Sequence, residues 1–130
     1  MKAEALARAI ENGLGVEVVP IPLANATALE GVDRLRLTSC AVEPPVDQYL
    51  LEDYDFVARG QLIMTLDKAD LGKAQDQLVD VVRIVADLTS GDLLLVRESE
   101  SVALRRHAGR FDVVLSDPLW REPSRVEPFR

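Results

Sequence analysis

The chain has 130 residues, the size of one ordinary domain, of which 48% are hydrophobic and 28% charged. That balance is typical of a globular protein and excludes a disordered or collagen-like chain. The formal net charge of −7 disfavours nucleic acid or an anionic membrane surface as the main partner, and favours a basic protein instead.

The cysteine content and the apolar runs bear on the compartment. Cys40 is the only cysteine, so no internal disulfide calls for an oxidising environment. No apolar run approaches the roughly 20 residues needed to cross a bilayer. Glu4 and Arg8 interrupt the apolar pattern that a signal peptide would need. We therefore expect a cytoplasmic protein.

The first third of the chain predicts a short helix followed by strands. Apolar residues recur at helical spacing over residues 3–10, and the glycine-rich residues 12–15 end this helix. Residues 16–19 predict a strand that stops at the prolines following it. Residues 23–32 show no clear period and are expected to be irregular, whereas the alternation over residues 35–40 predicts a strand.

The remainder predicts a long strand, a long helix and further strands. Residues 56–66 alternate, with Gly60 expected at a bulge. Residues 67–89 carry one apolar stripe at helical spacing and predict the central packing helix, with Asp67 as its N-cap. A meander of three strands is predicted next, at residues 93–96, 101–105 and 111–115. Residues 93–96 are apolar throughout, which suits a central strand.

These elements together predict a single α+β domain over residues 1–130. We expect a mostly antiparallel sheet, with the short N-terminal helix and the long central helix packed on one face and a three-stranded meander at the end. Residues 118–130 contain three prolines and predict a partly ordered tail, in which Trp120 docks on the core and the rest is loosely held.

The most unusual stretch is residues 43–55, which we call the acidic segment. It contains five carboxylates and no Lys or Arg, and Pro45 is expected to open a short helix over residues 46–51 unless the stretch is a loop. Tyrosine is enriched among interface anchors, while isolated acidic residues usually lie at the rim. The candidate partner-binding residues are Glu43, Asp47, Tyr49, Glu52, Asp53, Tyr54 and Asp55. Two other interpretations are a solvated charge run and a pair of catalytic carboxylates.

No motif predicts a catalytic centre, a metal site or a cofactor. No glycine-rich loop ending in Lys-Ser or Lys-Thr precedes a helix. His107 and Cys40 are single and distant in sequence, so we expect a solvated turn residue and a small buried apolar group. A basic cluster on the meander, interleaved with glutamates, predicts a mixed solvated face. Its members are Arg97, Arg105, Arg106 and Arg110.

Residues 60–120 carry a resemblance to a bacterial family. The strand ending in Leu66-Asp67-Lys68 leads into an amphipathic helix, then Thr89-Ser90-Gly91-Asp92-Leu93-Leu94-Leu95, Val102-Ala103-Leu104-Arg105-Arg106, a Gly109-Arg110 turn and Trp120. This stretch resembles the immunity proteins of the swarming-inhibition lipoprotein toxin systems described in myxobacteria. The chain departs from that family in opening with a helix and in having Glu98-Ser99-Glu100 where the family has a Phe-Asn-Gly turn. The resemblance implies a small cytosolic protein that binds the C-terminal domain of a toxin, without a catalytic residue.

Three hypotheses follow for the function. The leading one is a non-catalytic immunity-type protein that occludes a cognate, basic toxin domain through the acidic segment. The second is a small carboxylate-dependent enzyme or ligand-binding domain with a pocket between helix and sheet. The third is a homodimer that pairs through an exposed sheet edge or through the Trp120 tail.

Overall fold

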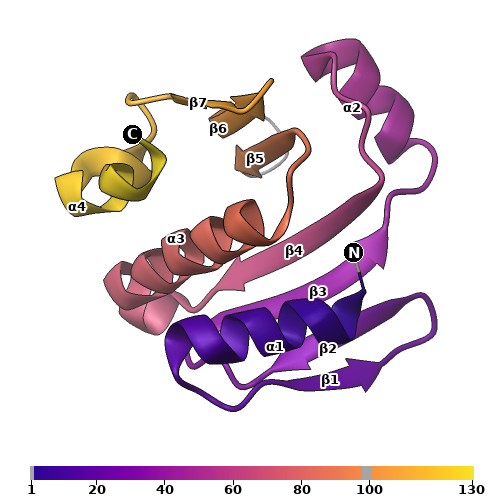
Figure 1. Ribbon diagram of the computed structural model, residues 1–130, viewed down its shortest axis with the longest axis vertical. Coiled ribbons are helices and arrows are strands. Elements are labelled where there is room, and N and C mark those ends of the chain that lie inside the picture. Colours follow the sequence, from indigo (N-terminus) through magenta and orange to yellow (C-terminus); the bar gives the residue numbers. More distant parts are fainter. Residues whose placement is uncertain (1, 98–100) are drawn as a thin grey trace. The chain divides into compact units, whose positions relative to one another are not determined.

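The computed structural model describes residues 2–97 and 101–130 and has the predicted α+β fold, in which the antiparallel strands form two sheets (Figure 1). The turn expected at Glu98-Ser99-Glu100 lies outside these residues. The chain divides into two compact units, Met1–Leu78 and Val79–Arg130. The single-domain organisation stays a prediction.

The first unit contains a four-stranded antiparallel sheet in the order β1-β2-β3-β4. Its strands are β1 (Val19–Pro22), β2 (Ala26–Glu30), β3 (Leu35–Ala41) and β4 (Gly60–Leu66). Helix α1 (Ala3–Leu14) packs against β1 and β2, and it ends at Gly15, whose φ of 68° is left-handed. Helix α2 (Val46–Tyr54) lies in the connection between β3 and β4.

The core of the first unit lies between α1 and one face of this sheet. Its buried apolar side chains include Leu6, Ala7, Ile10, Val18, Leu29, Leu35 and Leu37. The other face of the sheet, which we call the outer face, carries exposed apolar side chains. Val19, Ile21 and Ile63 are 46%, 36% and 48% exposed. The outer face therefore exposes apolar side chains beside charged ones, Glu30 and Arg36.

Three predicted boundaries in the first unit are wrong. The strand expected at residues 16–19 is β1, and it contains both prolines, since an edge strand tolerates residues that cannot donate to a ladder. Residues 23–32 are not irregular throughout, because β2 pairs on both sides, with β1 and β3. The strand expected at residues 56–66 begins only at Gly60, because its partner β3 ends opposite, at Ala41.

The predicted long helix is confirmed as α3 (Leu71–Leu88), which follows a 3-10 turn at Lys68–Asp70. Asp67 is the predicted N-cap, and its Oδ1 accepts the Ala69 N–H at 2.9 Å. The predicted apolar stripe is buried in its middle, at Ala74, Leu78 and Val81, and exposed at both ends. The helix crosses the boundary between the two units.

The second unit contains the predicted meander, with strands β5 (Leu93–Arg97), β6 (Ser101–His107) and β7 (Arg110–Val113) in that order. The central strand is β6, so residues 93–96 form an edge and not the expected centre. Short helical turns follow, namely η2 (Pro118–Arg121), α4 (Pro123–Val126) and η3 (Glu127–Phe129). Trp120 is 5% exposed and its indole N–H donates to the Ala103 carbonyl at 2.9 Å, which confirms that this side chain docks on the core.

Arg106 does not belong to a solvated basic face, contrary to the sequence interpretation. It is 7% exposed, and its guanidinium donates to the carbonyls of Ala86, Thr89 and Gly91. These carbonyls lie at and just beyond the C-terminal end of α3, where backbone acceptors lack helical partners. The side chain thus closes the end of the helix, and a local charge pattern cannot reveal such a role.

Candidate functional site

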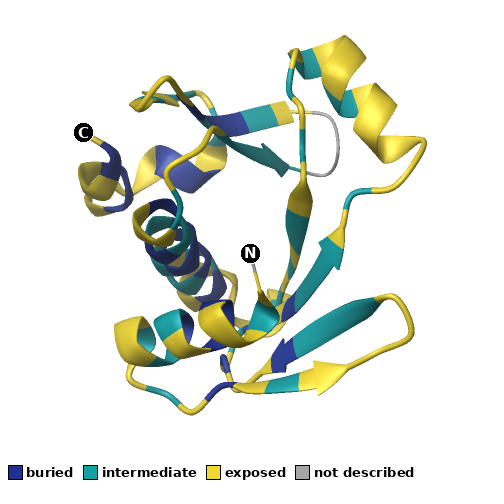
Figure 2. Cartoon of the chain, turned by 45° about the vertical axis from the view of Figure 1, so that its right-hand side comes forward, coloured by how far each residue is buried: buried dark blue, intermediate teal, exposed yellow. Residues whose placement is uncertain are grey.

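The acidic segment forms the turn before α2, the helix itself and its C-cap. The predicted helix over residues 46–51 is confirmed and extends to Tyr54. No residue of α2 is buried, as Figure 2 shows by the absence of dark blue from this helix. A helix that buries nothing in its own chain contributes little hydrophobic stabilisation to it.

The two tyrosines of the segment lie together. The rings of Tyr49 and Tyr54 meet edge to face, with centroids 5.8 Å apart and an interplanar angle of 86°. Their hydroxyl oxygens are 3.3 Å apart. The predicted site therefore presents a joined aromatic pair and not two separate side chains.

The carboxylates of the segment are unevenly placed along α2. Asp47 lies in the first turn, where a negative charge is favourable. Glu52 and Asp53 lie in the last turn, and Asp55 is the C-cap at φ 50°, where negative charges oppose the helix dipole. The Glu52 carboxylate accepts a hydrogen bond from Gln48 Nε2 at 2.9 Å. Acidic charge thus gathers at the helix end where it stabilises the helix least.

A hollow of about 400 Å³ joins the acidic segment to the outer face of the sheet. Its sheet wall includes Thr38, Cys40 and Ile63, and its other wall includes Glu43 and Val46. Val46 is 40% exposed. The surface around the segment therefore combines apolar side chains with polar and acidic ones, and an apolar centre with a polar rim is the usual anatomy of a protein interface.

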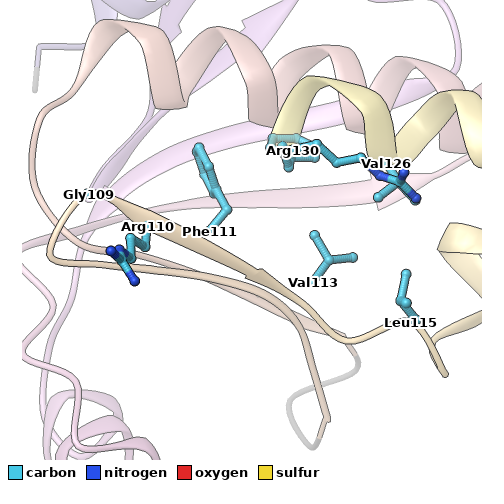
Figure 3. A pocket seen from close by; sticks show the side chains of 8 residues that line it. Gly109, Arg110, Phe111, Val113, Leu115, Val126 and Arg130 are labelled. Carbon is cyan, nitrogen blue, oxygen red and sulfur yellow. The ribbon is translucent and has the colours of Figure 1, made fainter.

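The second unit has a hollow of its own, of about 550 Å³, which Figure 3 shows from close by. Phe111 and Val113 line it from β7, and Val126 lines it from the C-terminal turns. Arg110 and Arg130 are its charged lining residues, and no carboxylate side chain of residues 2–97 or 101–130 lines it. This hollow lies between sheet and helical turns, as the ligand-binding hypothesis requires, but it lacks the acidic group of a carboxylate-dependent enzyme.

Shifted carboxyl pKa values occur away from the acidic segment. The pKa of Asp67 lies below its ordinary value because its carboxylate accepts the Ala69 N–H and a hydrogen bond from Arg34 at 2.9 Å. The pKa of Asp33 is lowered by Lys73, whose Nζ lies 2.6 Å from Asp33 Oδ2. The Arg34–Asp67 pair is half-buried and the Asp33–Lys73 pair is exposed, and both link the turn before β3 to the end of β4 or the start of α3, so we assign them a structural role.

The single histidine and the single cysteine lie in different units. His107 is at the predicted hairpin tip, with its Nδ1 3.2 Å from Asp92 Oδ2. Cys40 is half-buried in β3 and lines the hollow beside the acidic segment. In the described ranges, no group of three or more His, Cys, Asp or Glu residues is arranged to hold a metal ion. Over those same ranges, every helix is too short or too polar to span a bilayer.

The sequence identified the acidic segment but missed the surface that adjoins it. The outer face is assembled from strands whose residues are distant along the chain, and β1 and β2 were misplaced. The alternation of β3 was the one sequence signal for this surface, because it predicts that Cys40 lies on the face of the sheet opposite to Leu35 and Leu37. Comparison of the chain with protein-family models, with curated proteins and with solved structures gave no match.

Proposed function

We propose that this chain is a non-catalytic immunity-type protein that binds a cognate bacterial toxin domain in the cytoplasm and neutralises it by covering its active surface. The observation that carries the proposal is α2, which exposes carboxylates, Tyr49 and aliphatic side chains while burying none of its residues. The resemblance over residues 60–120 points to the same class of protein.

The charge distribution supports a basic partner. Residues 43–55 contain five Asp or Glu residues and no Lys or Arg, within a chain of net charge −7. A cation of the partner placed at the end of α2 relieves the unfavourable interaction of Glu52 and Asp53 with the helix dipole. The same charge attracts a basic domain before contact and accelerates its association.

The apolar part of the surface supplies the affinity in this proposal. Val46, Leu51 and Tyr49 are 40%, 48% and 37% exposed, so a partner can remove substantial apolar area from water here. Aromatic side chains at the centre of an interface commonly carry much of the binding energy. Occlusion of the toxin needs no bond to be made or broken by the immunity protein.

The proposal is tested with the polypeptide encoded immediately upstream of this chain. Expressed alone in a bacterial host, that polypeptide should arrest growth, and co-expression of this chain should restore it. An upstream product that is harmless, or a toxic one that this chain neither binds nor neutralises, would contradict the proposal.

The surface is tested with two charge reversals of equal size. Asp53→Lys lies within the acidic segment, and Glu17→Lys lies outside it on an exposed residue of the same unit. We expect Asp53→Lys to slow association with the toxin domain by about tenfold at low ionic strength and to flatten its salt dependence. Glu17→Lys should change the association rate much less. Equal effects of the two variants would show that only net charge matters and that the acidic segment is not the contact.

The ligand-binding hypothesis keeps one specific support, the hollow of the second unit. Because Arg110 and Arg130 are its charged lining residues, it would select an anionic ligand with an apolar body. Titration with a medium-chain fatty acid tests this: saturable binding that Arg110→Met weakens would favour the alternative.

A further inference from the structure

The two edges of the four-stranded sheet differ in what they offer to another strand. The Leu23 N–H donates to the Ala26 carbonyl at 2.8 Å, which fixes the hydrogen-bond alternation of β1 against β2. Residues 19 and 21 therefore direct their backbone groups toward β2, and residues 18, 20 and 22 direct theirs outward. Residues 20 and 22 are prolines and have no N–H to offer.

The remaining outward position of the β1 edge is occupied by α1. The Val18 N–H donates to Glu11 Oε1 at 3.0 Å, and the Val18 carbonyl accepts a hydrogen bond from Arg8. Arg8 and Glu11 are themselves ion-paired at 3.1 Å. The β1 edge thus presents no N–H donor to an incoming strand, which is how natural sheets prevent edge-to-edge pairing.

The β4 edge, in contrast, has outward backbone N–H groups whose hydrogen bonds another strand can accept. The Asp67 N–H donates to the Arg34 carbonyl at 2.9 Å, so residues 61, 63 and 65 face β3 and residues 60, 62, 64 and 66 face outward. Within residues 2–78, no group forms a hydrogen bond with the outward backbone of Leu62, Met64 or Leu66. The strand carries no proline and no charge along its seven residues.

The sequence of β4 fits a second copy of itself. An antiparallel pair centred on Ile63 sets residue 60 opposite residue 66 and residue 62 opposite residue 64 of the second copy, so that outward backbone groups meet outward backbone groups over the whole strand. Gln61 lies opposite Thr65, both uncharged. Ile63, 48% exposed in one copy, lies opposite its own equivalent.

We propose that β4 is a self-association edge through which two copies of this chain pair antiparallel about a two-fold axis at Ile63, extending one sheet into the next. Because the β1 edge offers no donor, each copy has one available edge in this sheet, and association stops at a closed dimer without growing into a fibre. The proposal does not rest on the proposed function, since it involves no toxin.

Charge substitutions at Ile63 test the pairing without disturbing the buried face. The pair at the axis is not hydrogen-bonded, so its Cα atoms lie about 4.5 Å apart and its side chains are in contact. Two lysines or two glutamates there repel each other. We expect Ile63→Lys and Ile63→Glu each to raise the dimer dissociation constant on the order of 100-fold. An equimolar mixture should form a heterodimer that neither variant forms with itself.

The measurements are mass by light scattering on a sizing column and amide hydrogen exchange. The wild-type chain should be dimeric, with exchange at Leu62 and Met64 slowing as the concentration rises. Val57→Lys, at a side chain 75% exposed and outside β4, is the matched control and should leave the dimer intact. A monomeric wild type, a dimer that persists in Ile63→Lys, or a mixture that stays monomeric would each overturn the proposal. A monomer whose β4 amides are protected would show that the chain covers this edge itself.

Discussion

Replacing Arg106 by methionine removes the side chain that closes the C-terminal end of α3. Its guanidinium lies 2.7 Å from the Ala86 carbonyl, 3.0 Å from that of Thr89 and 2.6 Å from that of Gly91. Ala86 is buried, so its carbonyl loses its side-chain partner without access to water, at a cost of about 1–3 kcal/mol. Thr89 is half-buried and Gly91 exposed, and their carbonyls can hydrate, which costs about 0.5–1.5 kcal/mol each.

These terms add to about 2–6 kcal/mol, and methionine recovers part of it because no charge is then buried. We expect Arg106→Met to lower the free energy of unfolding by about 2–4 kcal/mol, measured by urea denaturation followed through helical circular dichroism. Arg110→Met, at an exposed residue of the next strand, is the control and should stay within about 0.5 kcal/mol of the wild type. A loss below about 1 kcal/mol for Arg106→Met would refute the role assigned to this side chain.

Two further predictions concern acidic groups. The pKa of Asp67 lies below its ordinary value of 3.8, chiefly because the Ala69 N–H donates to it and next because Arg34 does. Since the pKa is lower in the folded state, the carboxylate stabilises the fold above about pH 3.8, and this contribution is lost as the pH falls through the folded pKa. In Asp67→Asn, the free energy of unfolding measured by urea titration should therefore fall less steeply at acidic pH than in the wild type. Asp53→Asn should raise the free energy of unfolding of the isolated chain by about 0.3–1 kcal/mol, because it removes a negative charge from the C-terminal end of α2, and should weaken toxin binding in the same preparation. A variant that loses both stability and binding would point to a folding role for Asp53.

The elements read from hydrophobic periodicity could be predicted, and those that depend on pairing could not. The apolar stripe of α3 and the Asp67 cap of the 3-10 turn before it are local signals, and both are confirmed. The strand β2 has a weak local pattern and exists because it has hydrogen-bonded neighbours on both sides. The predicted strand ended before the prolines of β1, because the sequence does not show whether their backbone faces a neighbouring strand. The register of the sheet, a non-local property, turns these positions away from β2, so the missing N–H groups cost no hydrogen bond.

The candidate site was likewise predicted from the sequence only in part. Composition alone identified residues 43–55, because five carboxylates without a basic neighbour are conspicuous in any sequence. The hollow beside them depends on Thr38 and Ile63, which oppose each other in neighbouring strands but lie far apart along the chain. Arg106 was misread for the same reason, since its partners belong to the end of a helix at a distance in sequence.

The two proposed surfaces of the first unit share Gln61 and Ile63, which line the hollow beside the acidic segment, but the acidic segment itself is not part of β4. The acidic segment connects β3 to β4 and ends shortly before Gly60, the first residue of β4. In the proposed antiparallel pair, Gly60 lies opposite Leu66 of the second copy, so the two acidic segments lead into opposite ends of the paired strands. Seven residues of strand at about 3.3 Å each hold these ends about 20 Å apart, beyond the screening length of about 8 Å at physiological ionic strength. Repulsion between the two segments therefore does not oppose dimerisation, and each copy keeps its own acidic surface for a partner, which predicts two toxin domains per dimer.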